Sequence, residues 1–165
     1  MIKYIKRYIK DLDGNTILEY KNSDKVAIAT LINDSNHLSN LDFSNLDLQG
    51  LSIENCRFYN CKFSNSYLFL AKIKGCIFTN CNFEGTTLTS SNILGGEFVN
   101  CNFSEAEMRN IYFVKSMIKN CNFHNTYMAH SKLLYCDFKY NNLENANTNN
   151  TDWHKTIIEN KDLHE

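Results

Sequence analysis

The feature that most constrains this chain is a large apolar residue that returns at every fifth position over more than two thirds of its length. An α-helix repeats about every 3.6 residues and a β-strand about every 2, so neither produces this period. Thr148 is the one member of the series without a large apolar side chain. The others are Leu38, Phe43, Leu48, Ile53, Phe58, Phe63, Leu68, Ile73, Phe78, Phe83, Leu88, Ile93, Phe98, Phe103, Met108, Phe113, Ile118, Phe123, Met128, Leu133, Phe138, Leu143, Trp153, Ile158 and Leu163.

The position two residues before each of these central residues forms a second series. It begins with three leucines, after which small residues predominate. Each unit of five therefore has two inward positions, one large and one small, and three mostly polar positions. All seven cysteines of the chain belong to this small series: Cys56, Cys61, Cys76, Cys81, Cys101, Cys121 and Cys136.

The chain also repeats at twenty residues. The segment Asn60-Cys61-Lys62-Phe63 returns with small changes at Asn80, Asn100 and Asn120. Four units of five therefore complete one turn, and equivalent residues stack from turn to turn at about the spacing of paired β-strands, 4.8 Å. Residues 38–153 then form nearly six turns, a rod roughly 28 Å long at that spacing.

This pattern resembles the pentapeptide-repeat family, whose unit is written A-(D/N)-L-x-x. The unit Leu41-Asp42-Phe43-Ser44-Asn45 and the pair Ala146-Asn147 match it closely, although this chain prefers Cys, Ser or Thr to Ala and Phe to Leu. The resemblance implies an all-β solenoid, a right-handed quadrilateral β-helix of about six coils. It is a poor guide to function, because one fold serves many functions.

Residues 1–37 lack the period and are expected to form an N-terminal cap. Two short strands are predicted over residues 4–9 and 16–20, because Asp13-Gly14 between them is a strong hairpin signal. Ser23 is a predicted N-cap for a helix over residues 24–32. The apolar side of that helix would consist of Val26, Ile28, Ala29, Leu31 and Ile32. Such a hairpin and helix would cover the exposed edges of the first coil.

Residues 154–165 follow the last full unit and could be a final coil, a capping helix or a frayed tail. The resemblance adds a further possibility, since in some family members this end joins two rods into a dimer. The residues that could serve a homodimer here are Trp153, Ile157, Ile158 and Leu163. A monomer and a dimer are both compatible with the sequence.

The charge of the chain is balanced, with 17 Lys plus Arg and 18 Asp plus Glu. This gives no basic footprint for nucleic acid, and no segment is apolar enough for a membrane helix. The first residues alternate apolar and basic side chains and form no signal peptide. We therefore expect a cytoplasmic protein without direct nucleic-acid or membrane binding. An odd number of cysteines also argues against a full set of disulfides.

The residue types that usually carry chemistry do not converge in this pattern. A column of parallel cysteines cannot surround a metal ion, and such thiols act as small core residues. The five histidines lack carboxylate or thiol partners at metal or catalytic spacing, and His124 and His130 occupy outward positions on different sides of the coil. The acidic residues Glu97, Glu105 and Glu107 lie on a convex rod without the cleft that a hydrolase needs. We expect no enzyme activity, no cofactor and no metal.

One outward column carries a stronger signal, because three stacked residues in it are apolar: Leu94, Val114 and Leu134. Tyr112 and Tyr135 lie beside them, and Tyr67 and Phe69 form a smaller group on another face. The column is either a contact patch for a partner or a second copy, or a chance group on a β-rich surface.

The favoured function is a non-enzymatic scaffold or protein-interaction module of unknown partner. The alternative is a DNA-mimic-like modulator of a type II topoisomerase such as gyrase, which the resemblance suggests. That reading needs a strongly negative rod, whereas residues 38–153 contain ten acidic and nine basic residues.

Overall fold

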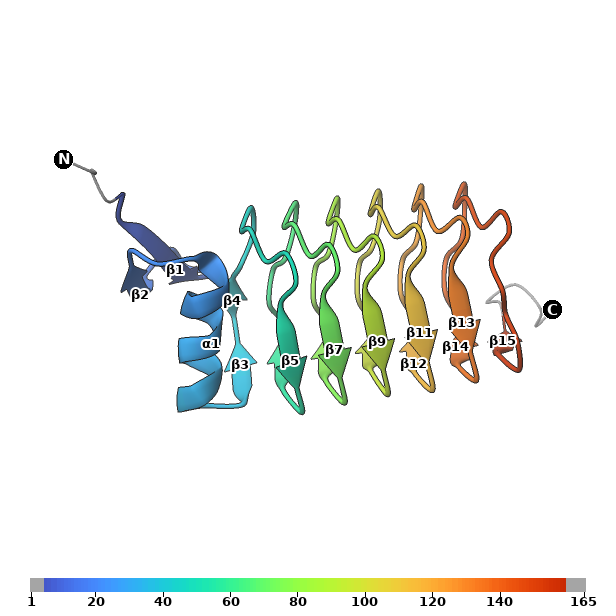
Figure 1. The fold of residues 1–165 in the computed structure, drawn as a ribbon, viewed down its shortest axis with the longest axis horizontal. Coiled ribbons are helices and arrows are strands. Elements are labelled where there is room, and N and C mark those ends of the chain that lie inside the picture. Colours follow the sequence, from blue (N-terminus) through green and yellow to red (C-terminus); the bar gives the residue numbers. More distant parts are fainter. Residues whose placement is uncertain (1–4, 160–165) are drawn as a thin grey trace.

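The computed structural model describes residues 5–159 and shows an elongated rod with a small cap at its N-terminal end (Figure 1). The expected solenoid is confirmed. The larger of its two parallel sheets has the order β15-β14-β12-β10-β8-β6-β3. Its strands are β3 (His37–Ser39), β6 (Arg57–Tyr59), β8 (Ile77–Thr79), β10 (Glu97–Val99), β12 (Met117–Lys119), β14 (Asp137–Lys139) and β15 (Ile157–Glu159).

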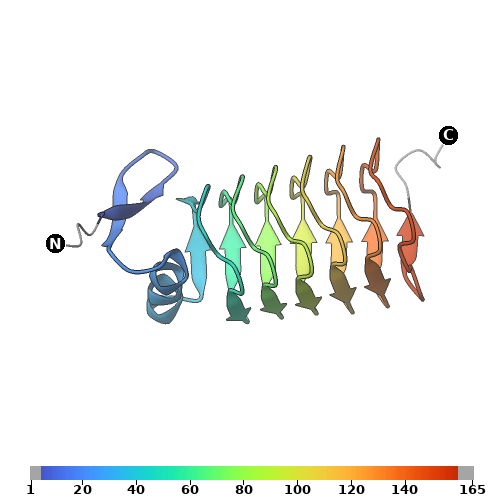
Figure 2. The same ribbon diagram turned by 45° about the horizontal axis from the view of Figure 1, so that its top comes forward.

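A second parallel sheet covers the neighbouring side of the coils, and Figure 2 shows the two sheets as two rows of arrows along the rod. Its order is β13-β11-β9-β7-β5. These strands are β5 (Ser52–Glu54), β7 (Lys72–Lys74), β9 (Asn92–Leu94), β11 (Tyr112–Val114) and β13 (Lys132–Leu134). Each strand pairs with the one twenty residues away, as Phe58 does with Phe78.

The other two sides of each coil are held by single bridges rather than full strands. Lys62 pairs with Asn82 on one side and Tyr67 with Thr87 on the other, again twenty residues apart. The coil therefore has four sides. Since the strands of the larger sheet recur every twenty residues from His37 to Ile157, the chain completes six coils between its first and last strand.

The chain turns each corner through a residue in the left-handed backbone region, two places after the central residue of a unit. Among residues 5–159, twenty non-glycine corner residues have φ between 51° and 60°, and twelve of them are asparagine. Asparagine tolerates this region better than most residues, which explains its abundance.

The large inward residues stack in ladders that fill the rod. The rings of Phe63, Phe83, Phe103 and Phe123 lie nearly parallel, with centroids 4.9 to 5.0 Å apart. A second ladder runs through Phe58, Phe78 and Phe98, at 4.8 and 4.9 Å. All of these rings are buried, as the five-residue period predicted.

The small inward residues satisfy backbone groups as well as filling space. The hydroxyl of Thr86 donates a hydrogen bond of 2.7 Å to the carbonyl oxygen of Phe63, and that of Ser91 does the same to Leu68. The thiol of Cys81 lies 3.5 Å from the carbonyl oxygen of Phe58. A buried carbonyl thereby gains a donor that alanine cannot supply, which explains the preference for Cys, Ser and Thr at this position.

The cap closes the N-terminal end of the rod. Strands β1 (Arg7–Asp11) and β2 (Thr16–Tyr20) form the expected antiparallel hairpin, and β1 also pairs with β4 (Leu41–Asp42) of the first coil. The first strand covers residues 7–11 rather than the predicted 4–9. Helix α1 (Asp24–Asp34) begins after Ser23, whose hydroxyl accepts from the Val26 amide. The hairpin and helix before the first coil thus have the predicted order.

The apolar side predicted for the helix is partly wrong. Val26 is 48% exposed and Ala29 is exposed, whereas Ala27 and Ile28 are buried. Leu31 and Ile32 are half-buried against the core. The helix presents a narrow edge to the first coil rather than a broad face, so fewer of its apolar positions reach the core.

The coil continues beyond Trp153. Strand β15 pairs with β14 in the same register as all earlier coils, with Ile158 opposite Phe138. Of the alternatives for the C-terminal segment, a final coil therefore describes it as far as Glu159.

We predict that Phe103→Ala lowers the free energy of unfolding by about 3 to 5 kcal/mol, because the ring is fully buried between two stacked phenylalanines. Chemical denaturation measures the change. Tyr59→Ala is the control, since Tyr59 is 53% exposed and should lose far less. Equal losses in both variants would contradict the register of the coil.

We predict that Leu70→Asn raises the free energy of unfolding by about 1 kcal/mol. Leu70 has φ of 59° and is 46% exposed, so it bears the strain of a left-handed corner with little burial in return. The reciprocal change Asn110→Leu, at the same corner two coils later, should lower the free energy of unfolding by a similar amount. Two unchanged denaturation midpoints would show that the corners carry no such strain.

Candidate interaction surface

The predicted patch lies on the five-stranded sheet, where three neighbouring strands each contribute one apolar residue. Val114 pairs with Leu94 on one side and with Leu134 on the other. Leu94 is 44% exposed and the other two are half-buried, so the three side chains form a ridge along the rod. We call this ridge, with Tyr112 and Tyr135, the apolar patch.

The two tyrosines flank the ridge and are held by cations. The ammonium of Lys132 lies 5.3 Å from the ring centroid of Tyr112, and that of Lys155 lies 5.3 Å from that of Tyr135. The ring of His154 packs edge-on against Tyr135 at 5.6 Å. The structure thus brings all five predicted residues to one side of the coils.

Tyr135 has an unusual backbone for such a bulky residue. It occupies a left-handed corner with φ of 57° and is nonetheless 49% exposed. A corner asparagine would fold with less strain. The signal that could have found it is a bulky residue where the repeat otherwise favours asparagine or glycine.

The other predicted aromatic group is also present. Tyr67 and Phe69 lie on a different side of the rod, with ring centroids 6.0 Å apart in a stacked arrangement. Tyr67 is exposed and Phe69 half-buried. The group is smaller than the apolar patch and has no stacked apolar neighbour in the next coil, where Thr87 follows Tyr67.

The cysteines are all free and buried. Burial raises the pKa of the Cys76 thiol to about 11, and the neighbouring Cys101 thiol raises that of Cys81 to about 12. Thiols with raised pKa values stay protonated and are weak nucleophiles and weak metal ligands. They act here as small core residues that also donate to carbonyl groups.

One statement of the sequence analysis on the histidines is wrong. His124 does have a carboxylate neighbour, because the repeat of twenty places Glu144 directly over it with Nδ1 and Oε2 3.4 Å apart. Both groups are at the surface of the rod. Among residues 5–159 no group of three or more potential ligands for a metal ion is formed.

The three acidic residues considered as catalytic candidates do not face one another. Glu97 lies in β10, Glu105 at a left-handed corner, and Glu107 on the next side, where its carboxylate is 3.4 Å from Arg109. They point to different sides of a convex rod, which is not the arrangement of a paired-carboxylate site.

The C-terminal end of the rod exposes apolar residues. Ile157 is 55% and Ile158 44% exposed in the last described strand. Trp153 is half-buried, with its ring edge-on to Phe138 at 5.3 Å. Leu163, the fourth residue predicted for a dimer end, lies outside the described residues. Dimerisation through this end stays a prediction.

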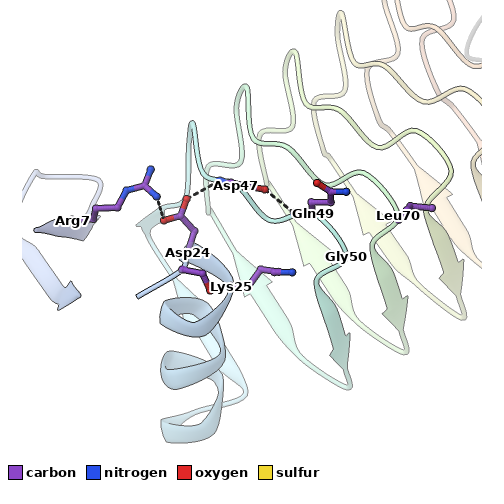
Figure 3. A pocket seen from close by; sticks show the side chains of 8 residues that line it. Arg7, Asp24, Lys25, Asp47, Gln49, Gly50 and Leu70 are labelled. Carbon is purple, nitrogen blue, oxygen red and sulfur yellow. Dashed lines mark hydrogen bonds and ion pairs between the residues drawn. The ribbon is translucent and has the colours of Figure 1, made fainter. Parts of the chain in front are cut away.

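The junction of cap and rod contains a buried carboxylate that the sequence analysis missed. Asp24 is 1% exposed and accepts hydrogen bonds from the Arg7 guanidinium and the Asp47 amide (Figure 3). It also accepts a hydrogen bond from the Tyr20 hydroxyl. The hydroxyl and amide bonds are both 2.7 Å long. Asp24 thereby joins helix, hairpin and first coil. The same residue lines a shallow open pocket with Lys25 (Figure 3).

Comparison with known families matches the model for pentapeptide repeats to residues 66–104 and 97–133, with 8 copies. No curated protein matches this chain. Within the described residues, no helix is long and apolar enough to cross a membrane.

Several solved structures resemble the rod. Full-length QnrB1, a plasmid-mediated fluoroquinolone resistance protein, has a TM-score of 0.34 and 14% identity over 74% of this chain and 84% of its own. HetL from Nostoc sp. strain PCC 7120 is a pentapeptide repeat protein involved in heterocyst differentiation regulation. It has a TM-score of 0.36 and 12% identity over 73% of this chain and 75% of its own. A pentapeptide repeat protein from the Arabidopsis thaliana thylakoid lumen has a TM-score of 0.32 and 17% identity over 64% of this chain and 59% of its own. Similarity at this level carries no argument about function.

The Tyr20–Asp24 contact predicts a loss of stability at alkaline pH. Burial, followed by the hydrogen bond to Asp24, raises the pKa of Tyr20 from 10.0 to about 12. A raised folded-state pKa means that the contribution is complete below the unfolded pKa of about 10 and is lost as pH rises toward 12. We expect a loss of about 2 kcal/mol over this range.

Melting temperatures of the wild type and Tyr20→Phe across that pH range measure the effect. The variant keeps every other tyrosine and lysine, so the difference between the two curves isolates Tyr20. Parallel curves would contradict the prediction.

Proposed function

We propose, from the premise that this chain is a pentapeptide-repeat protein, that it is a non-enzymatic rod that binds a protein partner through the apolar patch. The observation that carries the proposal is the ridge of Leu94, Val114 and Leu134 on three successive strands of one sheet, of which Leu94 is exposed and the other two are half-buried. Contiguous apolar surface of this kind marks contact sites on proteins.

The backbone of Tyr135 supports the same surface. A bulky residue in the left-handed region costs about 1 to 2 kcal/mol, and strained positions tend to cluster where a protein makes functional contacts. Tyrosine is also enriched at protein interfaces, because it buries a large ring while its hydroxyl remains hydrated. The strain and the exposure of Tyr135 therefore have one common explanation in a partner.

The chemistry of the rod supports a binding role over a catalytic one. The thiols lie inside the coil and are held protonated, and the acidic residues point away from one another. The coils stack into an elongated rod (Figure 1), whose long sides suit contact with another surface.

The alternative, modulation of a type II topoisomerase by mimicry of DNA, requires a negative surface along the rod. Acidic and basic residues are nearly equal over residues 38–153. A gyrase supercoiling assay with the purified chain, paired with its mass by light scattering, tests this alternative and the C-terminal dimer together. A dimer that alters supercoiling would favour the topoisomerase function over the scaffold.

We predict that Leu134→Asp leaves the coil folded and abolishes capture of the partner. The substitution places a charge in the middle of the apolar ridge, where a partner would have to desolvate it. Affinity capture from a lysate of the source organism, followed by mass spectrometry, compares the wild type with this variant.

Val99→Asp is the matched control, because Val99 is a half-buried strand residue at the equivalent place of the neighbouring side. Proteins retained by the wild type and Val99→Asp but lost by Leu134→Asp support the proposal. The same proteins retained by all three, or none by the wild type, would contradict it.

A further inference from the structure

We infer that the partner of the apolar patch is an acidic protein segment that carries apolar side chains between its carboxylates. This inference rests on the proposed function and adds the chemistry of the partner. It follows from the way charge is divided between the sides of the coil, which the balanced total of the chain conceals.

The side that holds the apolar patch is basic. It comprises the strands of the five-stranded sheet with the corners that follow them, and the equivalent residues 152–155. Five lysines lie on it, against two carboxylates, Glu54 and Asp152. The lysines are Lys72, Lys74, Lys115, Lys132 and Lys155, and all are exposed.

Both carboxylates of this side are already engaged. Glu54 lies 2.6 Å from the ammonium of Lys74, and one oxygen of Asp152 accepts from the His154 amide at 3.0 Å. For the residues that the structure describes, the Glu54–Lys74 contact is the one ion pair on this side. The remaining lysines therefore leave a net positive surface around the ridge.

The side opposite is acidic. It is the side on which Lys62 pairs with Asn82. Its outward and corner positions hold four carboxylates and one lysine, Lys62; the carboxylates are Asp42, Glu84, Glu105 and Glu144. The cross-section of the rod is thus polarised, with its apolar ridge on the positive side. A neutral rod with a chance apolar group would not require this division.

The lysines flank the ridge on both sides. Lys72 and Lys132 begin strands of the sheet, whereas Lys115 and Lys155 stand at the corners that follow. Leu94, Val114 and Leu134 lie between these two columns. A partner that places apolar side chains on the ridge would bring its neighbouring groups next to the lysines. Carboxylates are attracted at that position, whereas cations are repelled.

A second copy using the same side is disfavoured by this arrangement. A symmetric interface places each patch on its twin, so the lysine columns of the two copies would approach one another. Like charges at an interface raise its free energy. The charge therefore favours a different protein as the occupant.

Nucleic acid fits the surface less well than an acidic protein. Bases stack on open aromatic faces, but the rings of Tyr112 and Tyr135 are each covered by a lysine ammonium at 5.3 Å. The aliphatic ridge between the lysines offers phosphate no donor. Apolar side chains of a protein would instead gain free energy when they are buried against the ridge.

The test uses polymers of defined chemistry with the full chain. Fluorescence titration measures binding of labelled glutamate–tyrosine copolymer, polyglutamate, lysine–tyrosine copolymer and a duplex DNA oligonucleotide. We expect the glutamate–tyrosine copolymer to bind most tightly, and its affinity to fall as salt screens the lysines. Leu134→Asp should weaken this binding as well, because it disrupts the apolar contact.

Charge reversal of single lysines provides matched variants. Lys115→Glu and Lys132→Glu should each weaken binding of the glutamate–tyrosine copolymer by about threefold or more. Lys62→Glu makes the same change on the opposite side and should leave binding unchanged. Circular dichroism spectra and melting temperatures establish that each variant is folded before titration.

Three results would overturn the inference. One is absent binding of the glutamate–tyrosine copolymer, and another is an equal loss in Lys62→Glu. The third is equal or tighter binding of polyglutamate, the lysine–tyrosine copolymer or the DNA oligonucleotide. Each result would refute an acidic protein as the partner. The proposed function is tested separately, by the capture experiment with Leu134→Asp.

Discussion

The left-handed corner on which every unit turns is the constraint that the rest of the structure depends on. It bends the chain once in five residues, so four units close a coil and place each residue against its equivalent twenty positions away. The backbone amide of Phe63, for example, donates to the carbonyl of Asn82 in the next coil, and Phe83 does the same to Asn102. Sheets, ring ladders and side-chain hydrogen bonds all inherit that register.

Because equivalent residues of successive coils stack on one another, a residue type that suits one coil suits the whole column. Phenylalanine rings lie parallel at ring-stacking distance, and Asn82, Asn102 and Asn122 link their side-chain amides in a ladder with bonds of 3.0 and 3.1 Å. The same rule concentrates surface features. Three apolar residues in one outward column become a ridge, and lysines in the adjacent columns become its basic rim. The proposed binding surface is therefore a product of the stacking.

The ends of the rod interrupt this repetition and are handled differently. At the first coil, β1 pairs with β4, and the buried carboxylate of Asp24 ties hairpin, helix and coil together. At the other end, the last described strand leaves Ile157 and Ile158 exposed. One end is thus closed by specific polar contacts, whereas the described part of the other end presents apolar side chains.

The sequence by itself determined the repeat, the core and the position of the apolar patch, because each residue of the rod stacks on its equivalent at the fixed offset of twenty. It also placed the hairpin and helix, through Asp13-Gly14 and Ser23. Only the tertiary structure decided which side of the helix is buried, that Asp24 is the centre of the cap, and that Tyr135 is strained. The first two depend on how a non-repeating segment docks, for which no fixed offset in the sequence exists. The third follows from the backbone angle at the corner, which the structure supplies.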